Sequence, residues 1–265
     1  MKVLAIGDVV GQPGVEILSR FLRRLKREVS ADLTVVNGEN AAGNGITPAL
    51  ADELFDAGAD VITLGNHTFG NRSICDYLDE QRDILRPLNF PGQRPGVGYT
   101  VLECCGKSVC ICNLQGQVNL DYHVSSPFLA ADHLFKTVRA DLYLVDFHAE
   151  ATSEKQAMGY HLAGRAAAVW GTHTHVPTAD IRILPGGTGY ITDLGMTGGT
   201  ESVIGMNWQQ SLASFRGELT GRFQPSDLGR RIQGAVFTID SANRCIAAER
   251  VEFSDERIEK GAKNV

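Results

Sequence analysis

Five short islands of the chain contain side chains with oxygen or imidazole nitrogen donors. They are Gly7-Asp8, Asn37-Gly38-Glu39-Asn40, Gly65-Asn66-His67, Asp146-Phe147-His148 and Thr172-His173-Thr174-His175. Carboxylates, amides and imidazoles suit ions such as iron, manganese and zinc better than calcium. Five such islands in one chain are hard to explain by structural roles alone. Together they could assemble a two-metal hydrolytic centre.

The positions of these islands support the same interpretation. Asp8, Glu39, Asn66 and His148 each follow a short apolar run that predicts a β-strand. In open α/β sheets, ligands bind at the edge formed by the carboxyl ends of the strands. We therefore expect these residues, although distant in sequence, to converge in one cleft.

The His173-x-His175 pair is the strongest metal signal of the five. If this segment is extended, the two histidines share one strand face, with Cα atoms about 6.5–7 Å apart. Two imidazoles at that spacing could reach two ions separated by roughly 3.5–4 Å, as in two-metal hydrolases.

Each of the other islands also has an ordinary structural explanation. Asp8 could cap the helix that follows it, and Glu39-Asn40 could form a turn. Asn66-His67 could be a turn with a surface histidine, and His148 could be a hydrogen-bonded core residue. These explanations are reasonable one at a time but not for all the islands together.

The composition excludes several classes of protein. The 265-residue chain has a formal net charge of -6 and 43% hydrophobic residues. It therefore lacks the broad basic surface of a duplex nucleic-acid binder, and no apolar run approaches the roughly 20 residues of a membrane span. The amino terminus begins directly with a strand pattern, so we expect a cytoplasmic protein. Its expected partner is a small phosphoester or nucleotide substrate, and a homo-oligomer is compatible with the sequence.

Six cysteines could suggest disulfides or zinc binding. Four of them fall between positions 101 and 112, in a pattern that predicts a hairpin around Gly106-Lys107. Their spacing matches no zinc ribbon, so we predict reduced cysteines in the core.

The pattern of apolar residues predicts an α/β protein. Strands are expected at 2–7, 33–36 and 61–64, alternating with helices at 13–28, 47–57 (with Thr47 as N-cap) and about 71–80. Further strands are expected at 98–104, 108–113, 142–147, 167–172, 180–184, 189–192 and 233–240, with a helix at 127–138. This order predicts one domain over residues 1–253, with two packed mixed sheets flanked by helices, and a polar tail at 254–265.

The order of these motifs resembles that of the calcineurin-like metallophosphoesterases. More closely, it is similar to the bacterial YmdB-type branch of 2′,3′-cyclic-nucleotide phosphodiesterases. The similarity covers nearly the whole chain and includes the long stretches 146–155 and 171–180. It implies a four-layer α/β/β/α sandwich.

The departures from the broad superfamily fit that branch. The usual Asp-x-His is here Asp8-Val9-Val10, so the first histidine ligand is absent. The usual bridging aspartate is Glu39, and the glutamate that often follows Asn-His is Thr68.

The resemblance also implies a ligand set for two ions. One would be bound by Asp8, Glu39, Asn40 and His175, and the other by Glu39, Asn66, His148 and His173. Glu39 would bridge both ions. The resemblance favours iron, with manganese or zinc as alternatives.

The implied reaction is phosphodiester hydrolysis by a metal-bridged hydroxide. His67 would be the general acid that protonates the departing ribose oxygen. The alternatives are a phosphomonoesterase or protein phosphatase with the same centre, and a nucleotide-binding regulator without turnover. Residues 198–232 are expected to shape the substrate cleft or an interface.

Overall fold

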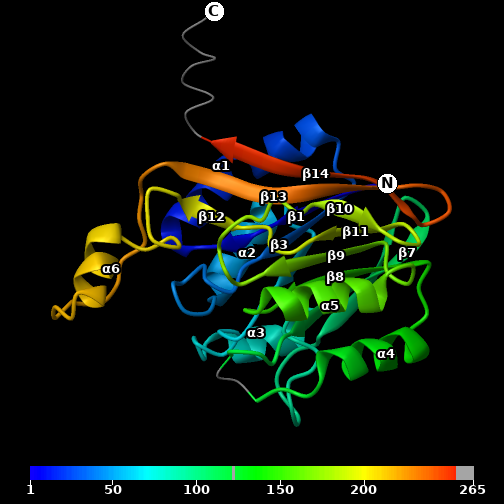
Figure 1. Cartoon of the computed structure of the whole chain (residues 1–265), viewed down its shortest axis with the longest axis horizontal. Coiled ribbons are helices and arrows are strands. Elements are labelled where there is room, and N and C mark those ends of the chain that lie inside the picture. Colours follow the sequence, from blue (N-terminus) through cyan, green and yellow to red (C-terminus); the bar gives the residue numbers. More distant parts are fainter. Residues whose placement is uncertain (121–122, 255–265) are drawn as a thin grey trace, which may run out of the picture.

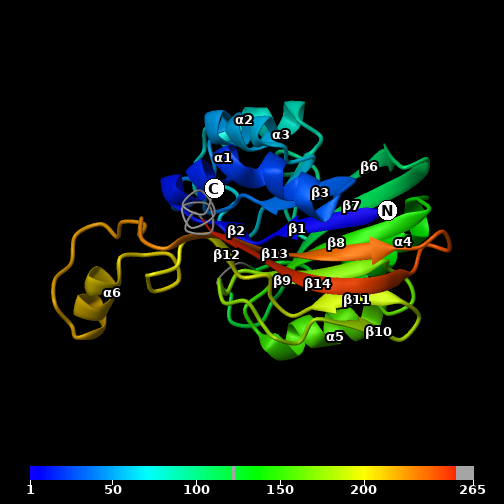
Figure 2. The same cartoon turned by 90° about the horizontal axis from the view of Figure 1, so that it is seen from above.

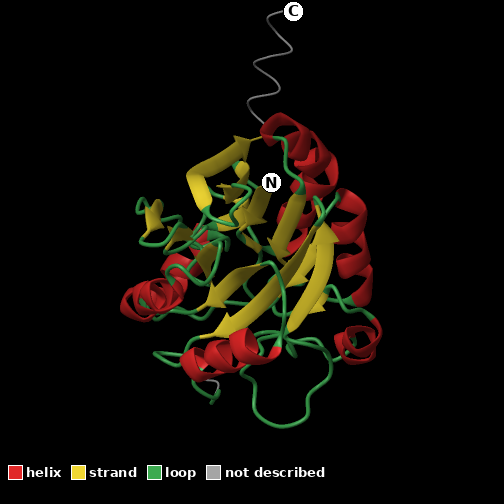
Figure 3. Ribbon diagram, turned by 90° about the vertical axis from the view of Figure 1, so that its right-hand side faces the viewer, coloured by secondary structure: helices red, strands yellow, loops and turns green. Residues whose placement is uncertain are grey.

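Two β-sheets form the centre of the structure, a computed structural model that describes residues 1–120 and 123–254. The first sheet contains β1 (Lys2–Ile6), β2 (Asp8–Val9), β3 (Leu33–Asn37), β4 (Val61–Thr63), β5 (Ile84–Leu85), β12 (Met196–Gly199), β13 (Arg230–Ile239) and β14 (Cys245–Ser254). The second contains β6 (Tyr99–Cys104), β7 (Lys107–Gln115), β8 (Leu142–His148), β9 (Ala168–Thr172), β10 (Arg182–Leu184) and β11 (Thr188–Ile191). Figure 3 shows these strands with helices around them.

Both sheets are mixed, as predicted. The first has the order β2-β12-β13-β1-β3-β4-β5, with β14 on β13, and the second has the order β10-β11-β9-β8-β7-β6. Strands β1, β3, β4 and β5 are parallel, whereas β13 pairs antiparallel with β1. In the second sheet β7, β8, β9 and β11 are parallel. Each sheet therefore has one edge where the carboxyl ends of several strands meet.

Helices cover the outer face of each sheet. Helices α1 (Gly11–Val29), α2 (Pro48–Ala57) and α3 (Ile74–Glu80) pack on the first sheet, and α4 (Pro127–Thr137) and α5 (Thr152–Leu162) pack on the second. Figure 2 shows α1, α2 and α3 on one side of the strands and α5 on the other. The predicted α/β/β/α sandwich is therefore confirmed. Helix α6 (Trp208–Phe215) stands apart from these layers, on an arm that leaves the first sheet (Figure 1).

Besides the apolar cores between each sheet and its helices, a third apolar core lies between the two sheets. Val35 of β3, Ile111 of β7 and Trp170 of β9 belong to this inter-sheet cluster, and all three are almost fully buried. The Trp170 ring stacks on Phe237 of β13, with ring centroids 5.9 Å apart. These residues alternate with those that face the helices, as the two-residue period of a strand requires.

Local signals account for most of the predicted elements. Helix α2 begins after Thr47, whose side chain accepts a hydrogen bond from the Leu50 amide, as expected. The hairpin between β6 and β7 turns at Cys105-Gly106, where both residues have positive φ. The alternative role of Asp8 as a helix cap is excluded, because the N-cap of α1 is Val10 and no side chain caps it.

Several elements were not predicted, among them α5, α6, β12 and β14. The buried face of α5 includes Glu154 and Lys155, so it lacks the apolar stripe that marks a helix in a sequence. Strand β14 pairs only with β13 among the described strands, and much of it is exposed, which weakens its apolar signal.

The remaining expectations concern thiols, the membrane and the tail. All six cysteines are free thiols, and Cys110, Cys112 and Cys245 are buried while Cys105 is exposed. None of the helices in the described parts of the chain combines the length and apolarity needed to cross a membrane. The predicted polar tail lies, apart from Ser254, outside the described residues.

The apolar core between the sheets should contribute a large part of the free energy of unfolding. Replacing Trp170 by alanine is expected to lower the free energy of unfolding by about 3–5 kcal/mol, because a large ring between the sheets is lost. Urea denaturation measures this change. The control is Leu219→Ala, at a fully exposed side chain. Equal stability of the two variants would contradict a core held by the Trp170–Phe237 stack.

Candidate metal centre

The predicted ligands meet where the carboxyl edges of the two sheets face each other. Asp8 starts β2 directly after β1, and Glu39 follows β3 by two residues. Asn66 follows β4, and His148 is the last residue of β8. The first sheet therefore contributes oxygen donors, and the second contributes imidazoles.

His148 is at the middle of this cluster. Its Nε2 lies 3.0 Å from Glu39 Oε1 and 3.0 Å from Asn66 Oδ1. The same nitrogen lies 3.1 Å from His173 Nδ1. Among the described residues, donor atoms of Glu39, His148 and His173 lie within 4.8 Å of one another and could hold a metal ion. These are three of the four ligands that the resemblance implies for one ion.

The residues implied for the other ion lie beside this group. Asp8 Oδ1 is 3.7 Å from His175 Nε2. Asn40 Nδ2 is 3.2 Å from the same histidine nitrogen and 3.2 Å from Glu39 Oε1. Asn40 thus directs its amide nitrogen to the cluster and its Oδ1 to His67. The amide would have to be reversed for its oxygen to act as a ligand.

The Asp8 carboxylate provides a test of whether a cation fits here. Asp8 is fully buried, and within the described chain its Oδ1 has no hydrogen-bond partner. A buried, unpartnered carboxylate oxygen is costly unless a positive charge compensates it. A metal ion beside Asp8 Oδ1 and His175 would supply that charge, so the donor set fits the implied group.

The expected extended geometry of the His173-x-His175 pair is wrong. Strand β9 ends at Thr172, and His173 and His175 have φ values of 102° and 64°. Non-glycine residues rarely adopt such positive φ values, so surrounding contacts must enforce them. The His173 amide donates to Asp8 Oδ2 at 3.1 Å, and the Thr174 amide donates to Asp193 Oδ2 at 3.2 Å. The two imidazoles are therefore positioned by a turn rather than by a strand face.

A buried ion pair stabilises this turn through hydrogen bonds to Thr174. Lys155 of α5 donates to Asp193 Oδ2 at 2.6 Å, and both side chains are about 1% exposed. Asp193 also accepts from the Thr174 hydroxyl at 2.8 Å and from the Gly195 amide at 2.8 Å. Sequence reasoning missed this pair. Its only signal in the sequence was a lysine within a segment that was not predicted to be a helix.

A hydrogen-bond chain fixes the orientation of His148. The Thr172 hydroxyl donates to Asp146 Oδ1 at 2.7 Å, so its oxygen accepts the hydrogen bond from His148 Nδ1 at 2.9 Å. With its proton on Nδ1, the ring presents Nε2 to the cluster. Such outer contacts commonly fix the ring orientation of metal-binding histidines.

The electrostatics of the cluster are dominated by burial and by the pairing of opposite charges. Burial disfavours ionisation of Glu39, but the nearby charge and hydrogen bond of His148 outweigh it and lower its pKa to about 2. Burial likewise opposes the charged form of His148, but Glu39 and Asp8 raise its pKa to about 9. The metal-free cluster therefore retains a proton on His148 at neutral pH, which a metal ion would displace.

Burial is the main cause of the pKa shifts of the neighbouring groups. Burial raises the pKa of Asp8, and it raises that of Asp146 to about 6. Burial and the positive charge of His148 lower the pKa of His173 to about 3, so this ring is neutral and available as a ligand.

His67 is placed differently from the predicted ligands. Its side chain is 40% exposed and lines a cavity of about 410 Å³ together with Glu39, Glu150 and His173. Its backbone amide donates to Glu39 Oε2 at 3.1 Å, and its Nδ1 lies 3.1 Å from Asn40 Oδ1. Glu150, which sequence reasoning did not select, lies 3.2 Å from His173 Nε2.

Comparison with known proteins places this arrangement in a family. The profile of the YmdB-like proteins matches residues 4–251. The chain belongs to the YmdB-like family. A 2′,3′-cyclic-nucleotide 2′-phosphodiesterase of Bacillus subtilis (strain 168) is 42% identical over 262 residues, which cover 97% of this chain and 99% of the relative.

Solved structures of similar and of more distant proteins agree with the fold. A phosphatase from Mycoplasma pneumoniae superposes with a TM-score of 0.90 at 36% identity, covering 98% of this chain and 96% of that one. A 5′-nucleotidase precursor from Thermus thermophilus superposes with a TM-score of 0.56 at 14% identity, covering 97% of this chain and 55% of that one. The second similarity supports the fold alone. The expectation that the chain is a hydrolase of the phosphodiesterase and phosphatase type is confirmed.

Gly65 leaves the space in which the ligands converge. A Cβ at this position would lie 2.3 Å from Glu39 Oε2 and 2.3 Å from His148 Nε2. Gly65→Ala is therefore expected to displace both side chains and to reduce Mn²⁺ binding about tenfold or more, with about 1–3 kcal/mol of destabilisation. Mn²⁺ titration and thermal unfolding measure the two effects.

Gly221→Ala is the matched control, because a Cβ there meets no atom within 4 Å. Wild-type Mn²⁺ affinity in Gly65→Ala would show that these ligands do not converge on a metal.

Proposed function

We propose that the protein hydrolyses 2′,3′-cyclic nucleotides at a centre of two metal ions. The observation that supports the chemistry is the buried cluster of Glu39, Asn66, His148 and His173, with Asp8 and His175 beside it. The proposed substrate is supported by the Bacillus relative, which is a 2′,3′-cyclic-nucleotide 2′-phosphodiesterase.

The position of Glu39 between the two groups of ligands supports a bridging role. Its Oε1 lies 3.0 Å from His148 Nε2 on one side and 3.2 Å from Asn40 Nδ2 on the other. The first ion would be held by Asp8, Glu39, Asn40 and His175, and the second by Glu39, Asn66, His148 and His173. When bound, such ions supply Lewis acidity and lower the pKa of coordinated water. We propose iron, with manganese or zinc as substitutes.

His67 is the proposed general acid. Its Nδ1 lies 3.1 Å from the side-chain amide of Asn40, and its ring borders the cavity beside the cluster. The ring is therefore placed to protonate the departing ribose 2′-oxygen of a substrate in that cavity. A side chain that is 40% exposed can then exchange its proton with solvent between turnovers.

A panel of phosphoesters tests the proposed substrate. The Mn²⁺-loaded or anaerobically purified iron enzyme should have a higher kcat/KM on 2′,3′-cyclic AMP than on 3′,5′-cyclic AMP or p-nitrophenyl phosphate. The product from 2′,3′-cyclic AMP should be adenosine 3′-phosphate. The alternative phosphomonoesterase predicts the highest value on p-nitrophenyl phosphate instead. Metal-loaded protein that hydrolyses none of the three would favour a nucleotide-binding regulator.

Substitutions separate metal binding from proton transfer. Glu39→Gln removes the bridging charge and should lose both metal and turnover. His67→Ala should keep the metal while kcat on 2′,3′-cyclic AMP falls about 10²–10⁴-fold, as for loss of a general acid. The effect should be much smaller on bis(p-nitrophenyl) phosphate, because p-nitrophenolate leaves without a proton.

His133→Ala is the histidine control, since His133 is exposed on α4. Loss of metal from His67→Ala, with normal turnover per remaining metal, would show that His67 is a ligand rather than an acid.

A further inference from the structure

A second cavity adjoins the candidate metal centre. It has a volume of about 630 Å³ and is bordered by the start of α1, the loop after β3, α2 and the arm that carries α6. Gly43 and Met206 line both this cavity and the one at the metal cluster. A ligand whose phosphate occupied the cluster could therefore extend into the second cavity, whose volume is in the range of small-molecule sites.

The lining of this cavity suits a flat, heteroatom-rich group. Ala41, Leu50 and Met206 contribute apolar surface, and Gln12 and Asn44 contribute amides. Each amide offers both a donor and an acceptor, which is what the edge of a nucleobase requires. Apolar surface interrupted by a few polar groups is typical of sites for such ligands.

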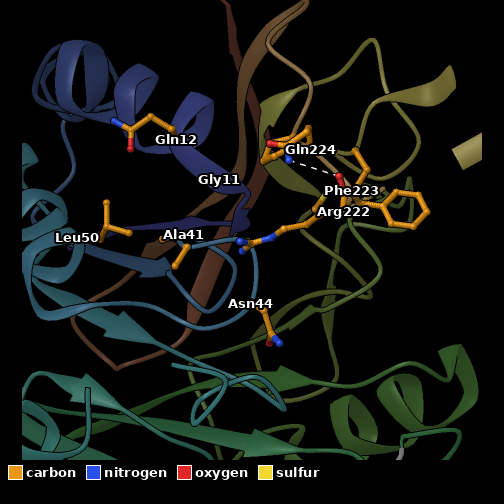
Figure 4. A pocket seen from close by; sticks show the side chains of 12 residues that line it. Gly11, Gln12, Ala41, Asn44, Leu50, Arg222, Phe223 and Gln224 are labelled. Atoms are coloured by element: carbon orange, nitrogen blue, oxygen red, sulfur yellow. Dashed lines mark hydrogen bonds between the residues drawn. The ribbon is translucent and has the colours of Figure 1, made fainter. Parts of the chain in front are cut away.

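Arg222 contributes charge to this cavity. Among the described residues that line it, Arg222 carries the only formal charge. Figure 4 shows its side chain extending from the arm toward Ala41 on the opposite wall. No carboxylate of the described chain pairs with this guanidinium within 4.0 Å. An unpaired guanidinium is free to stack on a base or to donate hydrogen bonds to it.

The arm holds Arg222 in place through its backbone. The Arg222 carbonyl accepts from Gln210 Nε2 at 3.2 Å, and the Gln224 amide donates to Gln210 Oε1 at 2.9 Å. Pro225 packs against Gly11, where an added Cβ would lie 2.4 Å from the proline ring. Helix α6 and α1 therefore fix the wall from which Arg222 projects.

We propose that this cavity, the Arg222 pocket, binds the nucleoside of the nucleotide substrate and that Arg222 contacts the nucleoside directly. This inference rests on the proposed function and extends it from the phosphate to the rest of the substrate. The arm is then a specificity element: it lies beside the reaction centre and contacts the nucleoside away from the phosphate and the departing 2′-oxygen.

The test compares a substrate that has a nucleoside with one that has none. For the metal-loaded Arg222→Ala enzyme, KM for 2′,3′-cyclic AMP should rise about tenfold or more, as expected for a lost charged hydrogen bond. Its KM for bis(p-nitrophenyl) phosphate should stay within about twofold of wild type, because the removed group does not touch the reacting phosphate. Adenosine should inhibit bis(p-nitrophenyl) phosphate hydrolysis competitively in the wild type and about tenfold more weakly in the variant.

Arg216→Ala is the matched control, since Arg216 lies on the same arm and is exposed. Arg222→Gln, which keeps polarity but loses the cation, should behave like Arg222→Ala. Equal effects on both substrates, or no effect on either, would overturn the pocket assignment while leaving the proposed function intact. A wild-type enzyme that hydrolyses bis(p-nitrophenyl) phosphate but not 2′,3′-cyclic AMP, and that adenosine does not inhibit, would overturn both.

Discussion

The carboxylate of Asp146 joins the two sheets at the edge where the candidate metal centre lies. It accepts from Thr63 of the first sheet at 2.5 Å and from Thr172 of the second at 2.7 Å, and the Asn37 amide lies 3.4 Å away. The inter-sheet core thus changes from apolar to polar along the strands. Because Thr172 in turn orients His148, the contact between the sheets also determines which nitrogen the central histidine presents.

The charge balance of the cluster explains why it suits a cation. Asp8 and Glu39 are both fully buried, and in the absence of metal a protonated His148 compensates part of their charge. Burying carboxylates without a partner would oppose folding. The two buried carboxylates that oppose folding would also attract metal ions. Stability and metal affinity therefore have the same electrostatic origin. Metal binding should accordingly be linked to folding through mass action.

The sequence predicts which residues converge better than it predicts their geometry. Asp8, Glu39, Asn66 and His148 could be placed because carboxyl ends of parallel strands meet at one edge. The conformation of His173 and His175 could not, because their positive φ values depend on Asp8 and Asp193, which are distant in sequence. Helix α5 was missed because its buried side includes Lys155, whose partner is known only from the tertiary structure. Similarly, the position of Arg222 depends on how the arm packs against α1.

The pairing of β1 constrains the order in which the first sheet can assemble. That strand lies between β3, which follows it closely, and β13, which begins at residue 230. The amino-terminal ligands therefore sit in a sheet that is finished only by the last part of the chain. The imidazoles at positions 148, 173 and 175 follow Asp8 and Glu39 by more than a hundred residues. The candidate centre should therefore take its final form only once β13 has paired with β1.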